Sequence, residues 1–243
     1  MLRPYEDILQ KQIYVNGTHY ETEVVHILKS LVKPNMTVID VGGHVGYYAL
    51  GFAKQVGPSG KVVIFEAQPD LCEQIRASLQ LNQISNVTVE NIALSNHNGN
   101  LILYQTSDRG RSSISSNRVS FQQLEIPAHR LDDYLSERHI EHVDLVKCDI
   151  EGAEWYALRG MESLLTQISP IIVLELHRQE IEDLGGTVEA LIDFLQALEY
   201  KIKLIHHKNG LIEFTPTNQA WTTQHIIAYK NPLPSLEPLL EEH

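Results

Sequence analysis

Three glycines behind an aspartate form the segment of this chain best suited to hold a ligand. The run reads Asp40-Val41-Gly42-Gly43-His44-Val45-Gly46-Tyr47-Tyr48. A short β-branched strand enters this turn and a helix leaves it, so the backbone can approach a ligand closely and the helix offers free N–H groups. Glu66 stands twenty residues beyond Gly46, at the end of the next expected strand. An acid there is placed to accept both ribose hydroxyls of an adenosine cofactor.

The glycine spacing distinguishes two classes of cofactor. The nicotinamide-dinucleotide pattern requires Gly-x-Gly-x-x-Gly, and aligning its last two glycines on Gly43 and Gly46 puts Val41 where the first should be. The spacing present, Asp40-x-Gly42-x-x-x-Gly46, is the pattern of S-adenosylmethionine (SAM) methyltransferases, in which the carboxylate helps to hold the amino-acid part of the cofactor. A glycine-rich turn that serves packing alone is the alternative, and the acid at Glu66 argues against it.

A second group of reactive side chains stands where two later strands end. Asp149 follows the expected strand 143–148, and Glu175 and His177 stand at the end of the strand that begins at Ile171. Ligands of open α/β sheets bind at the carboxyl ends of strands, and residues two apart on a strand share a face. We expect His177 to be the general base, because an unperturbed imidazole has a pKa near 6.5. Asp149 and Glu175 would orient the imidazole and the acceptor hydroxyl. For Glu175 and His177, an ion pair that only stabilises a loop is the alternative.

The same three residues also permit a metal-dependent version of the chemistry. Asp149, Glu175 and His177 would then surround a divalent cation that acidifies the acceptor hydroxyl. Carboxylate oxygens favour Mg²⁺ or Mn²⁺ over zinc. The three residues lack the spacing of a known metal site, so this is the weaker version.

Strands and helices alternate along the chain and predict parallel βαβ units within a single α/β domain over residues 1–243. The expected strands are 37–41, 61–65, 86–92, 143–148, 171–176, 201–206 and 225–229, which makes seven. The expected helices are 45–55, 69–81, 153–167 and 187–198. Residues 1–33 form an N-terminal cap segment.

Residues 94–130 interrupt this alternation. A turn cluster at 96–100, a short strand at 101–104 and a Ser-, Arg- and Gly-rich stretch at 108–118 predict an insertion of short antiparallel strands beside the sheet. The stretch contains Arg109, Arg111, Ser112 and Ser113. Its position suits a lid over the acceptor, and a flexible exposed loop is the alternative.

Composition and charge restrict the class of protein. The 243 residues are 43% hydrophobic and 21% charged, which is ordinary for a globular chain. No stretch approaches the roughly 18 apolar residues of a membrane span. With only Cys72 and Cys148, a disulfide framework is excluded and a cytoplasmic location is expected. The net charge of −12 opposes nucleic acid and anionic membranes as partners, which leaves a small-molecule or peptide acceptor. The sequence does not predict the oligomeric state.

Six segments together resemble the FkbM-type SAM-dependent methyltransferases. They are 40–48, Phe65-Glu66-Ala67-Gln68-Pro69, Ala93-Leu94-Ser95, 130–135, 146–154 and Leu174-Glu175-Leu176-His177. The resemblance spans about 20–229, and the Lys-x-Asp-x-Glu-Gly-x-Glu stretch that begins at Lys147 is its most specific part. His44 stands where the family usually has Asn, and Cys148 where it usually has Ile or Val.

The resemblance implies a fold, an activity and a set of cofactor contacts. The fold is a Rossmann-like, seven-stranded, mostly parallel sheet with an antiparallel last strand and helices on both faces. The activity is O-methylation of natural products or sugars. The implied cofactor-binding residues are Asp40, Gly42, Gly43, His44, Gly46, Tyr47, Glu66, Ala67, Ala93 and Asp149.

Two other functions remain open at this point. A nicotinamide-dependent oxidoreductase of similar fold is disfavoured because the chain contains no Tyr-x-x-x-Lys pair. A non-catalytic SAM-binding regulator would keep Asp40 and Glu66 but need not keep Asp149, Glu175 and His177 together. Base amino-methylation is disfavoured because Asp149-Ile150-Glu151-Gly152 replaces the Asn/Asp-Pro-Pro-aromatic motif.

Overall fold

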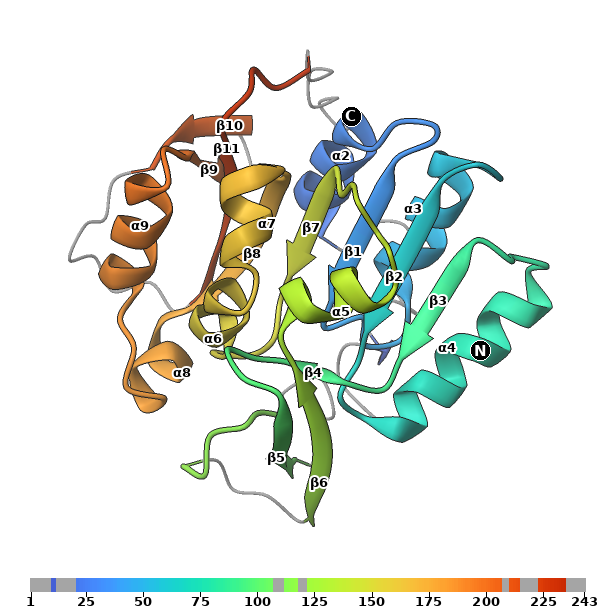
Figure 1. Ribbon diagram of the computed structural model, residues 1–243, viewed down its shortest axis with the longest axis horizontal. Coiled ribbons are helices and arrows are strands. Elements are labelled where there is room, and N and C mark those ends of the chain that lie inside the picture. The colour runs from blue at the N-terminus through green and yellow to red at the C-terminus, as the bar shows by residue number, and fades with distance from the viewer. Residues whose placement is uncertain are drawn as a thin grey trace.

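A central β-sheet organises the molecule (Figure 1). The computed structural model describes residues 10–11, 21–106, 112–117, 122–206, 210–214 and 223–234. Among these residues the sheet has eight strands in the order β10-β9-β11-β8-β7-β1-β2-β3. The strands are β1 (Thr37–Val41), β2 (Lys61–Phe65), β3 (Val87–Glu90), β7 (Leu145–Cys148), β8 (Ile171–His177), β9 (Lys201–His206), β10 (Gly210–Glu213) and β11 (Thr223–Tyr229).

The sheet confirms the Rossmann-like class. Strands β3, β2, β1, β7 and β8 pair in parallel, and β11 runs antiparallel between β8 and β9. The expected count of seven strands was wrong, because β10 adds an antiparallel eighth strand beside β9. β10 is only four residues long, with the sequence Gly-Leu-Ile-Glu, and so short a run gives no clear strand period.

Helices cover both faces of the sheet. The first face carries α2 (Thr22–Leu31), α3 (Tyr47–Val56) and α4 (Pro69–Leu81). The second carries α5 (Leu131–Glu137), α6 (Glu154–Arg159), α7 (Glu162–Gln167), α8 (Arg178–Asp183) and α9 (Val188–Ala197). The period of two divides each strand between them: Val38 packs with the first set and Ile39 with the second. None of the described helices combines the length and apolar character needed to cross a membrane.

The single helix expected over 153–167 was wrong, because the chain forms α6 and α7 with a break at Gly160 and Met161. A side chain at Gly160 would overlap the carbonyl oxygen of Ser95, so this point of the chain packs directly against another backbone. The carboxylate of Asp132 then accepts the N–H groups of Ser163 and Leu164, each at 2.9 Å, and caps α7. Neither contact changes the apolar period, so the pattern did not reveal the break.

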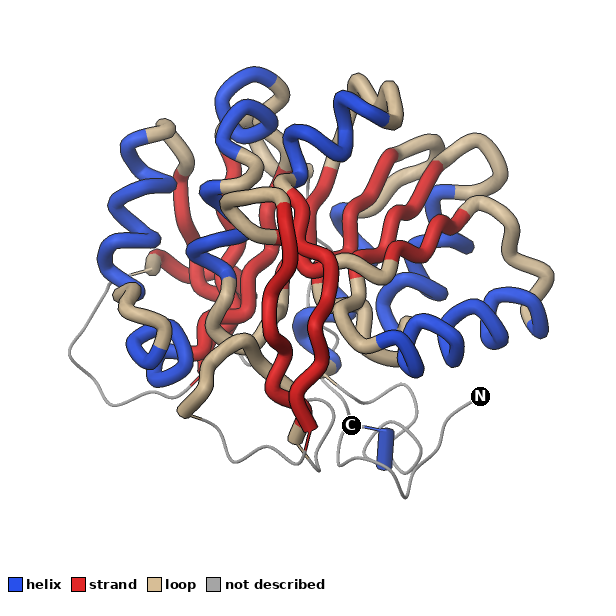
Figure 2. The backbone as a smooth tube through the Cα atoms, turned by 60° about the horizontal axis from the view of Figure 1, so that its bottom comes forward, coloured by secondary structure: helices blue, strands red, loops and turns tan. Residues whose placement is uncertain are grey.

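The inserted segment forms a separate sheet at the edge where β1, β2 and β7 end (Figures 1 and 2). Its described strands are β4 (Ala93–Leu94), β5 (Gly99–Gln105) and β6 (Gln122–His129), in the order β4-β6-β5. The expected antiparallel pairing holds for β5 and β6, but β4 is parallel to β6. Helix α5, which directly follows, was not predicted. Of the expected lid, residues 107–111 and 118–121 lie outside the described residues, and Arg109 and Arg111 are among them.

Candidate active site

The register of the sheet pairs charged residues on neighbouring strands. Asp40 on β1 lies opposite Lys147 on β7, and Glu175 on β8 lies opposite His225 on β11. Each stands two residues from a side chain in the core beneath α2, α3 and α4, so all four point to that face. The fold therefore gathers one ionic cluster on a single face, near the carboxyl ends of the parallel strands.

The glycine-rich turn is shaped by contacts within the protein itself. Gly42 and Gly46 have φ values of 80° and 78°, in the left-handed region that favours glycine. A Cβ on Gly42 would overlap the carbonyl oxygen of Asp149, and one on Gly43 would overlap the side chain of Ile64. Packing within the protein therefore requires glycine at both positions. The sequence predicts the same glycines for close approach of a ligand. The turn ends where Tyr47 begins α3.

Glu66 joins the turns that follow β1 and β2. Its buried carboxylate accepts the backbone N–H of His44 and that of Gln68, both at 2.8 Å. Burial raises the pKa of this carboxyl, and the two hydrogen bonds oppose the rise. A carboxylate offers about four acceptor positions, so the remaining ones suit two ribose hydroxyls.

The other two residues expected near the adenosine occupy adjoining turns. Ala67 directly follows Glu66, and Ala93 begins β4 just beyond β3. The Asn91 side chain donates to the carbonyls of Glu66 and Ala67, each at 2.9 Å, so the turn after β3 packs on the turn after β2. The expected cofactor residues therefore lie in neighbouring turns at one edge of the sheet.

Asp40 is a buried carboxylate that lacks a hydrogen-bond donor among the described residues. Only 1% of the residue is exposed, and neither oxygen has a hydrogen-bond partner in the part of the chain that the structure describes. Lys147 Nζ lies 3.8 Å from Oδ1. Burial raises the pKa of Asp40 to about 6, against the opposing effect of Lys147. Because buried polar groups are normally hydrogen-bonded, these oxygens fit a ligand that brings donors, such as the ammonium group of SAM.

Lys147 is the central cation of the cluster, and sequence reasoning treated it only as part of a motif. Its Nζ lies 3.3 Å from Oδ2 of Asp149 and 4.9 Å from the centre of the Tyr48 ring. Burial lowers the pKa of Lys147, but the carboxylates of Asp149 and Asp40 outweigh it and hold the pKa above its usual value. Burial would likewise raise the pKa of Asp149, yet Lys147 and His177 lower it to about 2. Asp149 is therefore an ionised carboxylate at the end of β7.

His177 lies among carboxylates and does not have the pKa that the sequence argument assumed. Nε2 is 3.6 Å from Glu175 and 3.8 Å from Glu151, and Nδ1 is 3.8 Å from Glu154. Burial lowers the pKa of the imidazole, but the carboxylates of Glu154, Asp149 and Glu151 outweigh it and raise the pKa to about 10. An imidazolium cannot accept a proton, so this environment opposes the expected role of His177 as general base.

Glu154, the first residue of α6, is completely buried. Its Oε1 accepts the N–H groups of Ile150 and Gly152, at 3.0 and 3.2 Å. It therefore holds the turn after β7 in shape and places a negative charge beside His177. The Lys-x-Asp-x-Glu-Gly-x-Glu stretch includes Glu154, but nothing in that pattern predicts that Glu154 is buried.

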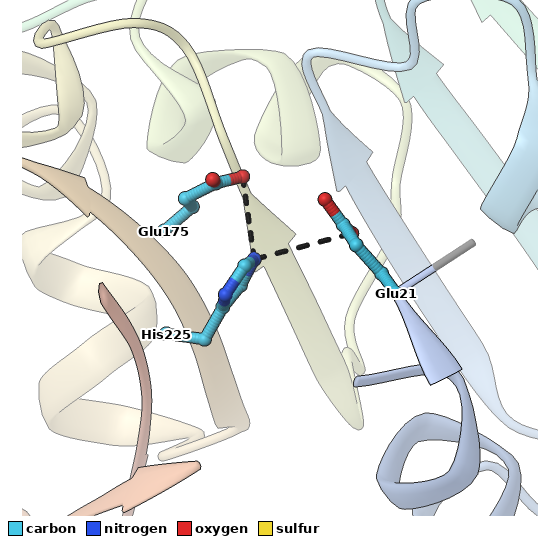
Figure 3. A group of neighbouring side chains, drawn as sticks. All are labelled: Glu21, Glu175 and His225. Atoms are coloured by element: carbon cyan, nitrogen blue, oxygen red, sulfur yellow. Dashed lines mark ion pairs between the residues drawn. The ribbon is translucent and has the colours of Figure 1, made fainter. Parts of the chain in front are cut away.

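His225 and Glu21 complete the cluster from outside the expected motifs. Figure 3 shows His225 between Glu175 and Glu21, with Nε2 3.3 Å and 4.0 Å from their carboxylates. Glu21 precedes α2, and the Tyr48 hydroxyl donates to it. His225 begins the last expected strand, 225–229, and belongs to none of the motifs found in the sequence. The expected antiparallel last strand is the feature of the sequence that could have placed His225 beside Glu175.

The described residues offer two sets of three side chains that could hold a metal ion. They are Asp149, Glu151 and His177, and Glu21, Glu175 and His225, with ligand atoms within 4.8 Å of one another in each set. The expected trio of Asp149, Glu175 and His177 is divided between these sets. Lys147 and His177 already place positive charge among the carboxylates. Burial lowers the pKa of His225, but the Glu175 carboxylate outweighs it and raises the pKa.

The chain is similar to known methyltransferases in sequence and in fold. Residues 40–202 match the sequence profile described as the Methyltransferase FkbM domain. The 2-O-methyltransferase NoeI of Sinorhizobium fredii is 26% identical over 189 residues, which cover 71% of this chain and 76% of NoeI.

Two solved structures share the fold. The structure of Methyltransferase FkbM from Methylobacillus flagellatus aligns with a TM-score of 0.55 and 18% identity, over 90% of this chain and 52% of that one. SMU.1697c of Streptococcus mutans, in complex with SAH, aligns with a TM-score of 0.52 and 13% identity, over 86% of this chain and 97% of that one.

Proposed function

The chain belongs to the FkbM methyltransferase family, and we propose that it transfers the methyl group of SAM to an oxygen of a sugar, natural-product or peptide-derived acceptor. The observation that carries the proposal is the buried Asp40 carboxylate, which accepts no hydrogen bond from any described residue and lies at the same sheet edge as Glu66. Transfer to oxygen is supported by NoeI, a relative named as a 2-O-methyltransferase.

The first half of the site would bind the cofactor. Asp40 would take the ammonium of its amino-acid part, and Glu66 would accept the ribose hydroxyls through oxygens already oriented by His44 and Gln68. When bound, SAM supplies a methyl group on a positively charged sulfur. Asp149 ends β7 beside Gly42 and presents an ionised carboxylate to the same edge.

The second half would orient the acceptor and remove its proton. In-line transfer requires aligned reactants, and a base assists when the acceptor is a hydroxyl. We assign removal of this proton to Glu175 as the base. Burial and the neighbouring Asp149 raise the pKa of this carboxyl above its usual value, which makes it a stronger proton acceptor. His177 and His225 flank its two oxygens at 3.6 and 3.3 Å and hold the carboxylate in place.

The acceptor class follows from charge. A net charge of −12 makes a phosphate backbone an unfavourable partner, whereas an uncharged hydroxyl compound is not repelled. A nicotinamide-dinucleotide cofactor is disfavoured, because the chain has Val41 where the Gly-x-Gly-x-x-Gly pattern requires its first glycine.

The direct test is ligand-dependent stabilisation followed by turnover. A ligand selective for the folded state at a hundred times its Kd stabilises by about 2.7 kcal/mol, so SAM and S-adenosylhomocysteine (SAH) should raise the melting temperature and NAD should not. Incubation with SAM and a panel of sugars, polyketide alcohols and peptides should then release SAH with a hydroxyl acceptor. A thermal shift with NAD and none with SAM or SAH would overturn the proposal.

A further inference from the structure

Residues 112–117, here called the serine segment, lie between the two halves of the proposed site. The Ser113 hydroxyl donates to the carbonyl oxygen of Glu151 at 2.9 Å. The Ser112 hydroxyl donates to the side-chain oxygen of Gln68 at 3.4 Å. Ser113 and Ser115 are 1% and 2% exposed, so the segment is packed into the molecule and does not lie loosely over it.

Strand β5 of the inserted sheet holds the serine segment in place. Ser113 and Tyr104 exchange two backbone hydrogen bonds, at 3.2 and 2.8 Å. One residue further along β5, the Gln105 amide donates to the Gln68 side-chain oxygen at 2.9 Å, and both residues are buried. Leaving either buried amide unsatisfied would be costly, so this side-chain pair fixes the end of β5. The long β5–β6 hairpin is visible in the foreground of Figure 2.

These contacts connect two turns with different proposed roles, one in binding the cofactor and one in the carboxylate cluster. The cofactor turn, residues 66–68, contains Glu66 and the Gln68 N–H that orients it. The carboxylate turn, residues 149–154, contains Glu151, whose side chain lies 3.8 Å from His177. The two turns follow β2 and β7, which are separated by β1 in the sheet. The inserted sheet therefore connects them directly, on a route independent of the main sheet.

We propose that Ser113 and Gln105 are positioning residues that hold the cofactor turn and the carboxylate turn at a fixed separation. The inference rests on the proposed function, because it assigns the first turn to the cofactor. Its consequence is energetic coupling: a ligand that stabilises the cofactor turn through Glu66 also restrains the carboxylate turn through Gln68, Gln105 and Ser113. The carboxylates that face the acceptor are then ordered after the cofactor has bound.

Amide hydrogen exchange with SAH as the probe tests this coupling. In the wild-type chain, saturating SAH should slow exchange at His44 and Gln68 in the cofactor half, and also at Gly152, whose N–H donates to Glu154. In Ser113→Ala and in Gln105→Met, exchange at His44 and Gln68 should still slow. The slowing at Gly152 should shrink by roughly tenfold, the effect of one hydrogen bond.

Matched controls come from the same segment and the same small sheet. Ser116→Ala changes an exposed serine of the serine segment, and Gln123→Met changes an exposed glutamine of β6. Both should behave as the wild type. Equal slowing at Gly152 in the wild type, Ser113→Ala and Gln105→Met would overturn the coupling, and either variant alone suffices if the other fails to fold.

Failure of the proposed function would look different. In that case SAH would slow exchange nowhere in the wild-type chain, and the coupling would fall with the function. Without any ligand, Ser113→Ala should still exchange faster than Ser116→Ala at Gly152, since the Ser113–Glu151 hydrogen bond belongs to the protein alone. No difference between these two variants would remove Ser113 as a positioning residue.

Discussion

Replacing Asp40 with asparagine should make the protein more stable and a poorer cofactor binder. The raised pKa of Asp40 means that ionising its carboxyl costs more free energy in the folded chain than in the unfolded chain. A raised acid contributes stability below its unfolded pKa of 3.8 and loses it as the pH rises through about 6. At about 1.4 kcal/mol for each factor of ten in acidity, the ionised carboxylate costs about 3 kcal/mol at pH 7 to 8. Asparagine does not ionise and so avoids this cost.

Urea unfolding between pH 5 and pH 8 measures the effect. The stability advantage of Asp40→Asn should grow from about 2 kcal/mol at pH 5 to about 3 kcal/mol at pH 8. At the upper value the melting temperature should rise by about 6–12 °C. Lys147 also pairs with Asp149 at 3.3 Å, so its charge should remain paired when Asp40 is replaced. Asp193→Asn, at an exposed acid on α9, is the matched control and should show no such growth with pH.

Calorimetry with SAH completes this test. Loss of the charged partner for the ligand's ammonium should weaken binding roughly ten- to a hundred-fold. Stability and affinity should thus move in opposite directions, as expected where a protein keeps a strained group for function. A variant that is less stable at pH 8, or equally stabilised at pH 5 and pH 8, would refute the reasoning about burial. Unchanged SAH affinity would remove Asp40 from the cofactor site.

Four further outcomes are expected. Glu66→Gln keeps an oxygen for the backbone but loses the charge, so SAH affinity should fall roughly ten- to a hundred-fold in calorimetry; no change would limit Glu66 to joining the two turns. Glu175→Gln should lower turnover by about 10²–10⁴-fold with SAH affinity retained, and full turnover at saturating acceptor would end its role as base. The raised pKa of His177 gives stability that is present below pH 6.5 and lost as the pH rises through about 10, so the stability gap between the wild type and His177→Gln in urea should shrink over that interval; a constant gap would contradict the imidazolium. Exhaustive EDTA treatment should leave turnover unchanged, whereas a loss restored by Mg²⁺ would make the carboxylates metal ligands.

Local patterns were sufficient to predict the helix and strands that carry the proposed cofactor half of the site. Helix α4 has the predicted limits, 69–81, because a proline begins it and an apolar stripe continues through it. The strand before the glycine-rich turn and the strand before Glu66 also have their predicted limits. Each contact here links residues close to strand ends, and strand ends are visible in sequence. The Rossmann-like class followed from the same alternation.

Pairing across the sheet determines the other half, and sequence periods do not contain it. His225 meets Glu175 only because β11 inserts antiparallel between β8 and β9 in one particular register. A shift by one residue would turn His225 to the opposite face. The charge of His177 depends in turn on Glu154. Glu154 is fully buried and accepts the Gly152 N–H, and no residue pattern predicts that burial. The prediction of His177 as a general base assumed an unperturbed imidazole, and the raised pKa of His177 does not fit that assumption.

Some residues of the proposed site lie within the matched family domain and others lie outside it. Asp40, Glu66, Asp149 and Glu175 all fall within the matched residues 40–202, whereas Glu21 and His225 lie outside them. His225 nevertheless contacts Glu175, and Glu21 accepts a hydrogen bond from Tyr48 of helix α3. The electrostatic surroundings of the family's own carboxylate are thus completed by segments before and after the domain. Glu175 lies between two imidazoles, and one of them, that of His225, comes from outside the matched residues.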